Sequence, residues 1–351
     1  MSTREQEALD LIERVRSKPL RFRDPQITMA HGAGGKATQA LIEGLLAPAF
    51  GLDTLADAAA VDGTAVTTDS FVVKPLRFPG GSIGELAVNG TVNDLAVAGA
   101  RPLALTLSLV LEEGLPAHDL RAEVEAIAAA AQAAGVSVVA GDTKVVERGH
   151  ADAMYLCTTG LGRRDPRARL APAALRPGDR LLVSGSIGEH GTAIMLARGE
   201  FELEAPVVSD TRSLWPAVDA LLTAAGPGLR CLRDATRGGV ASVLNELARA
   251  SGVAMVVREA AVPVEPAVAG ACEILGIDPM YVANEGKLVA AVAPEHAEAA
   301  LQALRAVPGG ERAAELGEVR TEPPGMVLVE TGFGGRRVMD QLVGDPLPRI
   351  C

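Results

Sequence analysis

The sequence predicts a mixed α/β (α+β) protein of two domains, and three observations lead to that prediction. The chain has 351 residues, which is more than a single hydrophobic core usually serves. Segments with strand-like and helix-like patterns alternate along both halves, as they do in mixed folds. Between the halves, residues 163–180 are rich in Arg and Pro and have no apolar period, which is typical of a domain boundary. We therefore expect domains over 27–165 and 176–343, an extension over 1–26 and a flexible tail over 344–351.

The first half begins with a glycine-rich turn, His31-Gly32-Ala33-Gly34-Gly35, that leads into a helix over 36–46. Its clearest strand covers residues 103–111, where leucine at every second position places five leucines on one face. The other elements expected here are a strand over 64–69, helices over 83–98 and 118–134, strands over 136–140 and 153–162, and a polar loop over 141–145.

The second half repeats the alternation of strands and helices. We expect strands over 180–185, 255–257 and 287–292, and helices over 186–198, 210–224, 238–250, 264–275 and 295–305. Residues 344–351 have no helical or strand pattern and are expected to form a tail.

Composition excludes several classes of function. The net charge of −11 argues against a surface for nucleic acid or for anionic membranes. No stretch approaches the ~18 consecutive apolar residues that span a bilayer, and the first 25 residues are too charged for a secretory signal. The four cysteines have no CxxC spacing, so neither a disulfide framework nor a zinc knuckle is indicated. These features favour a cytoplasmic protein.

Four short segments place a carboxylate at the end of an element, beside glycines or hydroxyls. Hard oxygen ligands of this kind suit Mg²⁺, which commonly holds a nucleotide through one or two carboxylates and phosphate oxygens. Each aspartate alone is more simply explained as a helix cap or a turn residue. The segments are Thr67-Thr68-Asp69, Asn93-Asp94, Gly141-Asp142-Thr143-Lys144 and Asp234-Ala235-Thr236-Arg237-Gly238-Gly239.

The Asp234 segment precedes an amphipathic helix, because Val240, Val243, Leu244 and Leu247 share one face. The unpaired N–H groups at such a helix start favour phosphate, although a plain glycine-started helix has the same pattern. The glycine turn at 31–35 follows the same logic and matches neither a Walker A loop nor a GxGxxG fingerprint.

Cys351 is the last residue of the chain, where no regular element requires a cysteine. The adjacent α-carboxylate should raise the pKa of its thiol, so another group must activate it or deliver a substituent to it. From Gly344 an extended tail reaches roughly 23 Å, and Pro346 and Pro348 stiffen it. A disordered terminus that ends in Cys explains the residue equally well. For Lys144 and Glu285, a solvated charge is the simpler interpretation.

Several motifs, taken in order, resemble the HypE family of hydrogenase maturation proteins, the carbamoyl dehydratases. They are AHGAGGKAT, TTDSFVV, LAVNGTVNDLAVAGARP, AGDTKVV, DATRGGV, NEGK and the terminal PRIC. The middle motifs are shared by the wider PurM-like superfamily of aminoimidazole ribonucleotide synthetase, selenophosphate synthetase and thiamine-monophosphate kinase. The cysteine-terminated tail narrows the resemblance to HypE.

The resemblance implies a two-domain PurM-like fold and a homodimer whose N-terminal domains form an intersubunit β-barrel. It implies ATP and Mg²⁺ held by Asp69, Asn93, Asp94, Asp142 and Asp234, with Thr143, Thr236, Gly34 and Gly35 near phosphate. It also implies that Cys351 receives a carbamoyl group from the carbamoyltransferase HypF. ATP then drives its dehydration to a cyano group, with Lys144 and Glu285 beside the sulfur. The cyano group passes to iron on a HypC–HypD complex.

Two other functions stay open at the level of sequence. One is an ATP-dependent kinase or synthetase of the same superfamily that acts on a diffusible substrate. The other is an ATP-responsive scaffold whose tail docks a partner without turnover.

Overall fold

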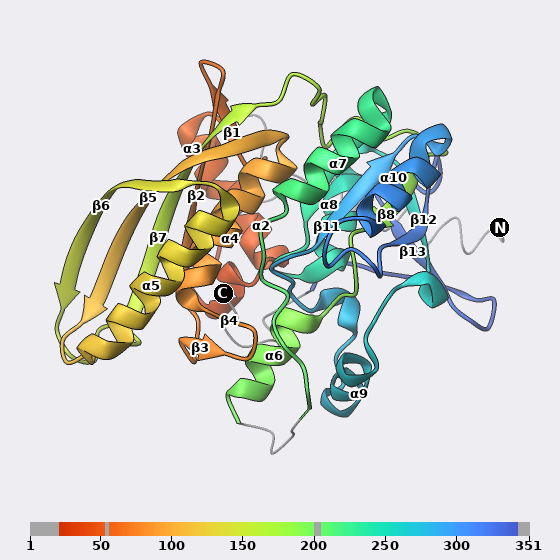
Figure 1. The fold of residues 1–351 in the computed structure, drawn as a ribbon. Helices are drawn as coiled ribbons and strands as arrows, with labels where there is room; N and C mark the ends of the chain where they lie inside the picture. Colours follow the sequence, from red (N-terminus) through yellow and green to blue (C-terminus); the bar gives the residue numbers. More distant parts are fainter. Residues whose placement is uncertain (1–20, 53–55, 200–204, 343–351) are drawn as a thin grey trace.

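The computed structural model describes residues 21–52, 56–199 and 205–342. It contains two large mixed sheets, of which the first has helices on one face and the second has helices on both (Figure 1). Most of the expected N-terminal extension and the whole tail with Cys351 lie outside the described residues. No helix in the described ranges is long and apolar enough to cross a membrane.

The first sheet has five strands in the order β1-β2-β7-β5-β6. Only the β5–β6 pair is parallel, because helix α5 crosses over between these two strands. Helices α4 and α5 pack on one face, around a core that includes Phe71, Leu86 and Leu105. The strands are β1 (Ala59–Val61), β2 (Thr64–Phe71), β5 (Ala100–Glu112), β6 (Ser137–Val146) and β7 (Met154–Arg164), and the helices are α4 (Ile83–Val97) and α5 (Ala117–Ala134). A short hairpin, β3 (Arg77–Phe78) and β4 (Gly81–Ser82), precedes α4.

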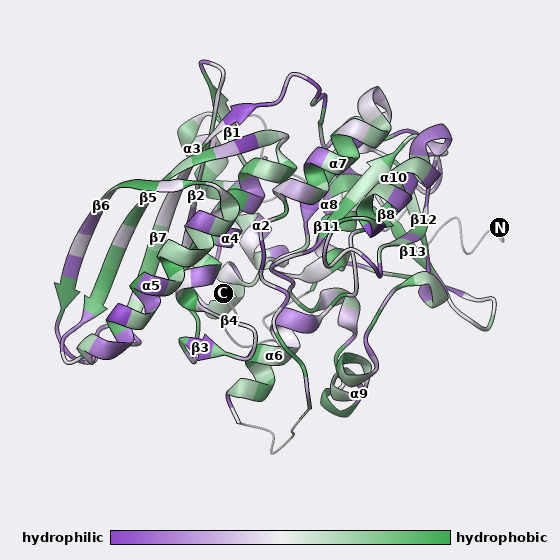
Figure 2. Cartoon of the chain, viewed as in Figure 1, coloured by the Kyte–Doolittle hydropathy of each residue, from purple (hydrophilic) through white to green (hydrophobic). Residues whose placement is uncertain are grey.

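The second sheet has seven strands in the order β14-β13-β10-β12-β8-β11-β9. Leu181 and Val289 face helix α8 on one side, whereas Leu182 and Leu288 face α7 and α10 on the other. Both faces are buried at the centre of the sheet, where all five residues of β11 are apolar and buried, and Figure 2 shows much of this sheet in green. The strands are β8 (Arg180–Val183), β9 (Leu229–Asp234), β10 (Ala254–Arg258), β11 (Leu288–Val292), β12 (Ala314–Arg320), β13 (Val327–Glu330) and β14 (Arg336–Val338). The helices are α6 (Glu189–Ala197), α7 (Trp215–Ala225), α8 (Gly239–Ser251), α9 (Pro266–Leu275) and α10 (Ala297–Arg305).

Helix α4 includes Asn89 and Gly90, although this pair usually favours turns. A Cβ atom on Gly90 would lie 2.8 Å from the Phe71 ring. Glycine therefore lets the helix pack closely against β2, and the expected helix over 83–98 is confirmed apart from its last residue.

The polar loop expected over residues 141–145 is wrong, because these residues continue strand β6. They pair in parallel with β5, with Asp142 opposite Ser108 and Lys144 opposite Val110. Charged side chains at this edge of the sheet reach solvent and so are compatible with a strand. The alternating leucines of β5 are also interrupted. Leu105 is fully buried but Leu103 is 43% exposed, because the pairing register with β7 shifts between Pro102 and Ala104.

Three helices differ from their expected bounds by three residues or more. The helix expected over 210–224 begins only at Trp215, because residues 210–214 form an irregular segment that is hydrogen-bonded to Asn93 of α4. The helix expected over 186–198 is shorter, from Glu189 to Ala197. The helix expected over 36–46 extends to residue 50 in three segments: α2 (Lys36–Leu41), a π-helical turn (Ile42–Leu46) and α3 (Ala47–Phe50). Pro48 lies in the first turn of α3, where a proline is tolerated.

Candidate active site

Three aspartates from separate parts of the chain meet between the two sheets. Asp57 precedes β1, Asp94 lies on α4 and Asp234 ends β9. One carboxylate oxygen from each lies within 4.8 Å of the others. Oxygen ligands at this spacing suit a divalent cation such as Mg²⁺. Asp57 had no recognisable signal in the sequence, because it lies in an irregular Ala- and Asp-containing segment.

The mutual repulsion of the three aspartates favours binding of a cation. Burial, followed by the charges of Asp234, Asp57 and Asp69, raises the pKa of Asp94 well above its usual range. Burial, followed by the charge of Asp57, raises the pKa of Asp234 to about 7. A cation among these groups would relieve their mutual repulsion.

Thr67 and Arg233 stabilise part of the negative charge of the three aspartates. The Thr67 hydroxyl donates to an Asp94 oxygen at 2.8 Å. The Arg233 guanidinium pairs with Asp57, and its other nitrogen lies 2.9 Å from Glu246. Arg233 therefore fixes one side of the cluster, a role that the sequence did not indicate.

Asp69 and Glu285 lie in the electrostatic field of the same cluster. Burial raises the pKa of Asp69, while the nearby Arg237 lowers it in part. The Glu285 side chain is buried, and burial, followed by Asp69, Asp210 and Asp234, raises the pKa of its carboxyl well above the usual range. A buried carboxyl with a raised pKa is a stronger base when ionised, so it is suited to accept a proton.

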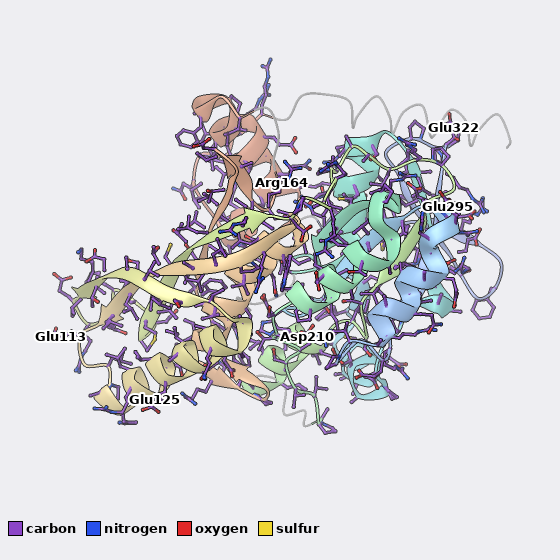
Figure 3. All side chains as sticks on the ribbon, turned by 45° about the horizontal axis from the view of Figure 1, so that its top comes forward. Glu113, Glu125, Arg164, Asp210, Glu295 and Glu322 are labelled. Carbon is purple, nitrogen blue, oxygen red and sulfur yellow. The ribbon has the colours of Figure 1, made fainter. Side chains whose placement is uncertain are left out.

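The backbone that carries Glu285 is fixed by a buried ion pair. Asp210 accepts the backbone N–H groups of Glu285 and Gly286, each at 3.1 Å. Its carboxylate also lies 2.9 Å from the Lys287 ammonium, which lies 2.7 Å from Glu189. Figure 3 shows Asp210 at the junction between the two domains.

Asn93 completes this junction. Its side-chain nitrogen donates to the carbonyls of Glu285 and Arg212, and its oxygen accepts the N–H of Leu214. The expected nucleotide-binding residue Asn93 thus ties α4 to the second domain and holds the Glu285 loop.

A glycine loop lies against the start of helix α8. Gly34 has φ +75°, and a Cβ atom there would lie 2.7 Å from the Arg237 carbonyl oxygen. The Arg237 guanidinium donates to the Gly32 carbonyl at 2.8 Å. The half-buried Thr236 precedes the helix start at Gly238 and Gly239, both of which have positive φ. This arrangement collects backbone N–H groups and a guanidinium, which suits a phosphate group.

The last residues that the structure describes, up to Leu342, contact the glycine loop at Gly35 and Lys36. The Leu342 carbonyl accepts the N–H of Lys36 at 3.1 Å, and the Lys36 ammonium lies 2.8 Å from Asp340. A Cβ atom on Gly35 would lie 2.6 Å from the Leu342 carbonyl oxygen. The tail therefore starts beside the glycine loop.

Asp142, Thr143 and Lys144 do not join the cluster within one chain. They are exposed on β6, where the Lys144 ammonium lies 2.7 Å from Asp142 and lowers the pKa of that carboxyl. Strand β6 is three strands from β2, which carries Asp69, so about 14 Å separates them. Asp142 also shares the face of Ser108, opposite the face of Leu107 that packs toward α4.

Comparisons with known proteins place the fold. The family model of the AIR synthase related protein N-terminal domain matches residues 55–164 of this chain. The model of the C-terminal domain of the same family matches residues 176–329. Carbamoyl dehydratase HypE of Bradyrhizobium diazoefficiens is 48% identical over 341 residues, which cover 95% of this chain and 99% of that protein.

Solved structures agree with these matches. The crystal structure of a HypE–HypF complex has a TM-score of 0.82 at 44% identity, covering 86% of this chain and 100% of that one. The structure of a HypE in complex with ATP has a TM-score of 0.79 at 44% identity, covering 93% of this chain and 100% of that one. The mixed α/β, PurM-like fold expected from the sequence is confirmed, and the chain belongs to the carbamoyl dehydratase HypE family.

Proposed function

We propose that this chain uses ATP to dehydrate a carbamoyl group on its own Cys351, giving a cyano group for the iron of nickel–iron hydrogenase. The position of the tail root is the observation that carries the proposal. Leu342 lies against the glycine loop, whose Gly34 contacts Arg237. The nine residues that follow Leu342 can extend about 31 Å, which is ample for Cys351 to enter the neighbouring site.

ATP and Mg²⁺ fit the residues around the cluster. Asp57, Asp94 and Asp234 would hold Mg²⁺, with Asp69 beside them, because their oxygens converge and their burial makes uncompensated charge costly. Mg²⁺ supplies charge neutralisation for the phosphates. The loop at Gly34 and Gly35, Thr236 and the α8 N-terminus would receive the phosphates.

The chemistry converts an amide oxygen into a leaving group. The carbamoyl oxygen attacks the γ-phosphorus of ATP, the bond to the β-phosphate oxygen breaks and ADP leaves. Loss of one nitrogen proton gives an S-bound imidate phosphate whose nitrogen is uncharged. Loss of the second proton, with cleavage of the carbon–oxygen bond, releases phosphate and leaves the S-cyano group. We assign proton removal to Glu285, whose buried carboxyl has a raised pKa and lies in the same field as Asp69 and Asp234.

A second copy of the chain is part of the proposal. Residues of β6 are exposed along an edge strand, including Val139 at 60% and Val145 at 67%. An exposed apolar edge is an unfavourable surface for an isolated subunit, so we propose a two-fold dimer with an intersubunit barrel. The open face of the sheet, which carries Asp142 and Lys144, would then meet the partner copy, where both residues can approach a site.

We further propose HypF as the carbamoyl donor, a HypC–HypD complex as the cyanide acceptor and the cytoplasm as the place of action. The HypF assignment is supported by the HypE–HypF complex formed by a relative of 44% identity. The other two assignments are what the resemblance of the sequence motifs to the HypE family implies.

A direct test compares ATP turnover in two cysteine variants, each supplied with the carbamoyltransferase and carbamoyl phosphate. Cys351→Ala should bind ATP but lose coupled turnover, whereas Cys157→Ser should keep it. Full turnover by Cys351→Ala with a soluble substrate would favour a small-molecule kinase. ATP binding without turnover in the unmodified protein would favour a scaffold.

A further inference from the structure

An interdomain cavity of about 490 Å³ lies apart from the carboxylate cluster. Residues of α4 and α5 line it on the side of the first domain, and residues at the end of α10 line it on the side of the second. Ala129, Ala133 and Leu304 belong to its apolar wall, and none of the three clustered aspartates lines it. A cavity of this volume has room for a small organic molecule.

Arg212 brings a positive charge to the wall of the interdomain cavity. Its Nε donates to the Gly286 carbonyl and its Nη1 to the Pro308 carbonyl, each at 3.0 Å. Both acceptors are uncharged, and no carboxylate among the described residues forms an ion pair with this guanidinium. Burial lowers the pKa of Arg212, and the charges of Asp210 and two glutamates offset this effect only in part. The guanidinium is therefore a half-buried cation without a paired anion.

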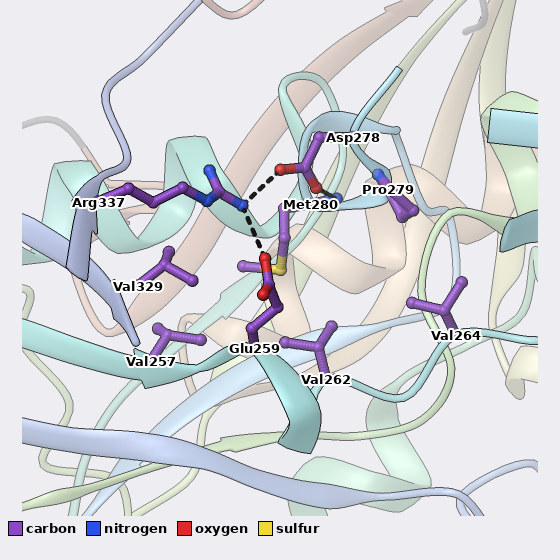
Figure 4. A pocket seen from close by; sticks show the side chains of 9 residues that line it. All are labelled: Val257, Glu259, Val262, Val264, Asp278, Pro279, Met280, Val329 and Arg337. Carbon is purple, nitrogen blue, oxygen red and sulfur yellow. Dashed lines mark hydrogen bonds and ion pairs between the residues drawn. The ribbon is translucent and has the colours of Figure 1, made fainter. Parts of the chain in front are cut away.

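A second cavity, of about 290 Å³, has a different charge balance (Figure 4). There the Arg337 guanidinium lies 2.8 Å from Asp278 and 3.5 Å from Glu259. Burial lowers the pKa of Arg337, but these two carboxylates outweigh it and raise that pKa. Arg337 therefore has its counter-ions within the chain, whereas the charge of Arg212 in the interdomain cavity calls for an anion from outside.

Two hydroxyl groups add hydrogen-bond donors to the wall that carries Arg212. The Thr211 oxygen accepts the side-chain N–H of Asn89 at 3.2 Å, and the oxygen of the buried Ser184 accepts the Leu288 N–H at 2.9 Å. Neither hydroxyl donates a hydrogen bond within the part of the chain that the structure describes. Both protons are therefore available to an oxygen atom of a ligand.

The charges around the interdomain cavity favour a ligand with a single negative charge. Glu85 lines the same wall, and the charge of Asp210 also acts on Arg212. A dianion would be repelled by these carboxylates, whereas one carboxylate group matches one guanidinium. Four alanines of α5 offer an apolar surface to the rest of the ligand. A short aliphatic carboxylate combines these features.

We propose that the interdomain cavity binds a small aliphatic carboxylate, with its oxygens on Arg212 and the two hydroxyls and its chain along the alanines of α5. Binding is coupled to the proposed base, because Arg212 also donates to the carbonyl of Gly286, the residue after Glu285. A molecule in the cavity thus contacts both domains and restrains the loop that carries Glu285. Binding requires neither ATP nor Cys351, so it can fail or succeed independently of the proposed function.

The test titrates the full chain, without nucleotide, with acetate, butyrate, hexanoate and inorganic phosphate, and calorimetry measures the affinities. Affinity for the carboxylates should rise with chain length, by up to about fourfold for each added methylene, because the chain packs on the alanines. Hexanoate should bind more tightly than phosphate. Arg212→Gln should weaken hexanoate binding at least about tenfold. Because this change also removes donors to two backbone carbonyls, a second variant is needed.

Ala133→Leu is that second variant, because it fills the cavity from an exposed position on α5 and leaves Arg212 intact. It should also weaken hexanoate binding at least about tenfold. Ala128→Leu, at an exposed position of the same helix that does not line the cavity, is the matched control and should bind as the wild type does.

Hydrogen exchange tests the coupling to the proposed base. Bound hexanoate should slow exchange at the backbone N–H groups of Glu285 and Gly286, and unchanged exchange there would overturn the coupling. No saturable binding of any of the three carboxylates, or hexanoate binding that survives both Arg212→Gln and Ala133→Leu, would overturn the site itself. Phosphate binding that depends on Arg212, without binding of the carboxylates, would mean a site for an inorganic ion and would equally contradict the proposal.

Discussion

The carboxylate of Asp210 lies 2.9 Å from the ammonium of Lys287, and both side chains are almost fully buried. Two backbone N–H groups, those of Glu285 and Gly286, point at the same carboxylate. Burial alone would raise the pKa of Asp210, but Lys287 and then His190 outweigh it and lower that pKa. Asp210 is therefore an anion that fixes the backbone of the proposed base, a role that no local sequence pattern indicated.

Asp210→Asn should lower the free energy of unfolding by about 1–3 kcal/mol, because an amide cannot satisfy two N–H donors and a buried ammonium. Dehydration should slow more than ATP affinity falls, since Glu285 is displaced while the phosphate loop is untouched. Denaturant unfolding and calorimetry measure the two effects. Asp219→Asn, in an exposed pair with Arg167, is the control and should change stability by less than about 1 kcal/mol.

The stability of the cation-free protein should depend on the protonation of Asp234. Its folded pKa of about 7 lies above the ordinary value of 3.8, so protonation favours the folded state. This contribution is fully present below about pH 3.8 and is lost as the pH rises through about 7. We expect the Tm of the protein to fall between about pH 6 and about pH 8, and Asp234→Asn to flatten this slope.

Mg²⁺ should reverse the loss at high pH. At a hundredfold excess over its dissociation constant, a bound cation stabilises the folded state by about 2.7 kcal/mol. Thermal unfolding with and without Mg²⁺ tests this expectation in the wild type and in Asp234→Asn. Equal stabilisation of both proteins would rule out the cluster as the cation site.

Gly34→Ala should weaken ATP binding because it distorts the glycine loop. The residue has φ +75°, which costs an L-residue about 1–2 kcal/mol, and the new Cβ would meet the Arg237 carbonyl at 2.7 Å. Gly32→Ala is a matched control two residues away, because nothing lies within 4 Å of its Cβ position. Calorimetry that found equal ATP affinity in the two variants would remove the loop from the nucleotide site.

Val139→Lys should convert a dimer into a monomer, because a lysine on the β6 edge opposes pairing with a second sheet. Sedimentation at micromolar concentration compares it with the wild type, which we expect to be dimeric. Phe333→Lys changes an apolar side chain outside β6 that is more exposed than Val139, and it should leave the dimer intact. A monomeric wild type would contradict the intersubunit barrel.

Local patterns allowed part of the site to be predicted. The apolar period after Asp234 and the paired glycines define α8, which begins at Gly239 as expected within one residue. The alternation in β5 and the helix around Asn93 and Asp94 were also recognisable. In each case the residues that set the structure are close in sequence.

The parts that were missed depend on contacts between distant segments. Asp57 meets Asp94 and Asp234 only after the two sheets pack together. Asp210 does not begin a helix. Its carboxylate instead accepts backbone N–H groups from residues more than seventy positions away in the sequence. Likewise, β6 continues through Asp142 and Lys144 because β5 supplies the pairing, which no local pattern in a polar segment can reveal.

The most direct test of the central claim is the intact mass of the protein after incubation with carbamoyl phosphate, ATP and the carbamoyltransferase. The wild type should gain one carbamoyl group at Cys351 and then lose one water. Glu285→Gln should gain the group and keep it, because the proton acceptor is missing, and Cys351→Ala should gain nothing. A carbamoyl group on any other residue, or a wild-type adduct that never loses water while ATP is consumed, would contradict the account.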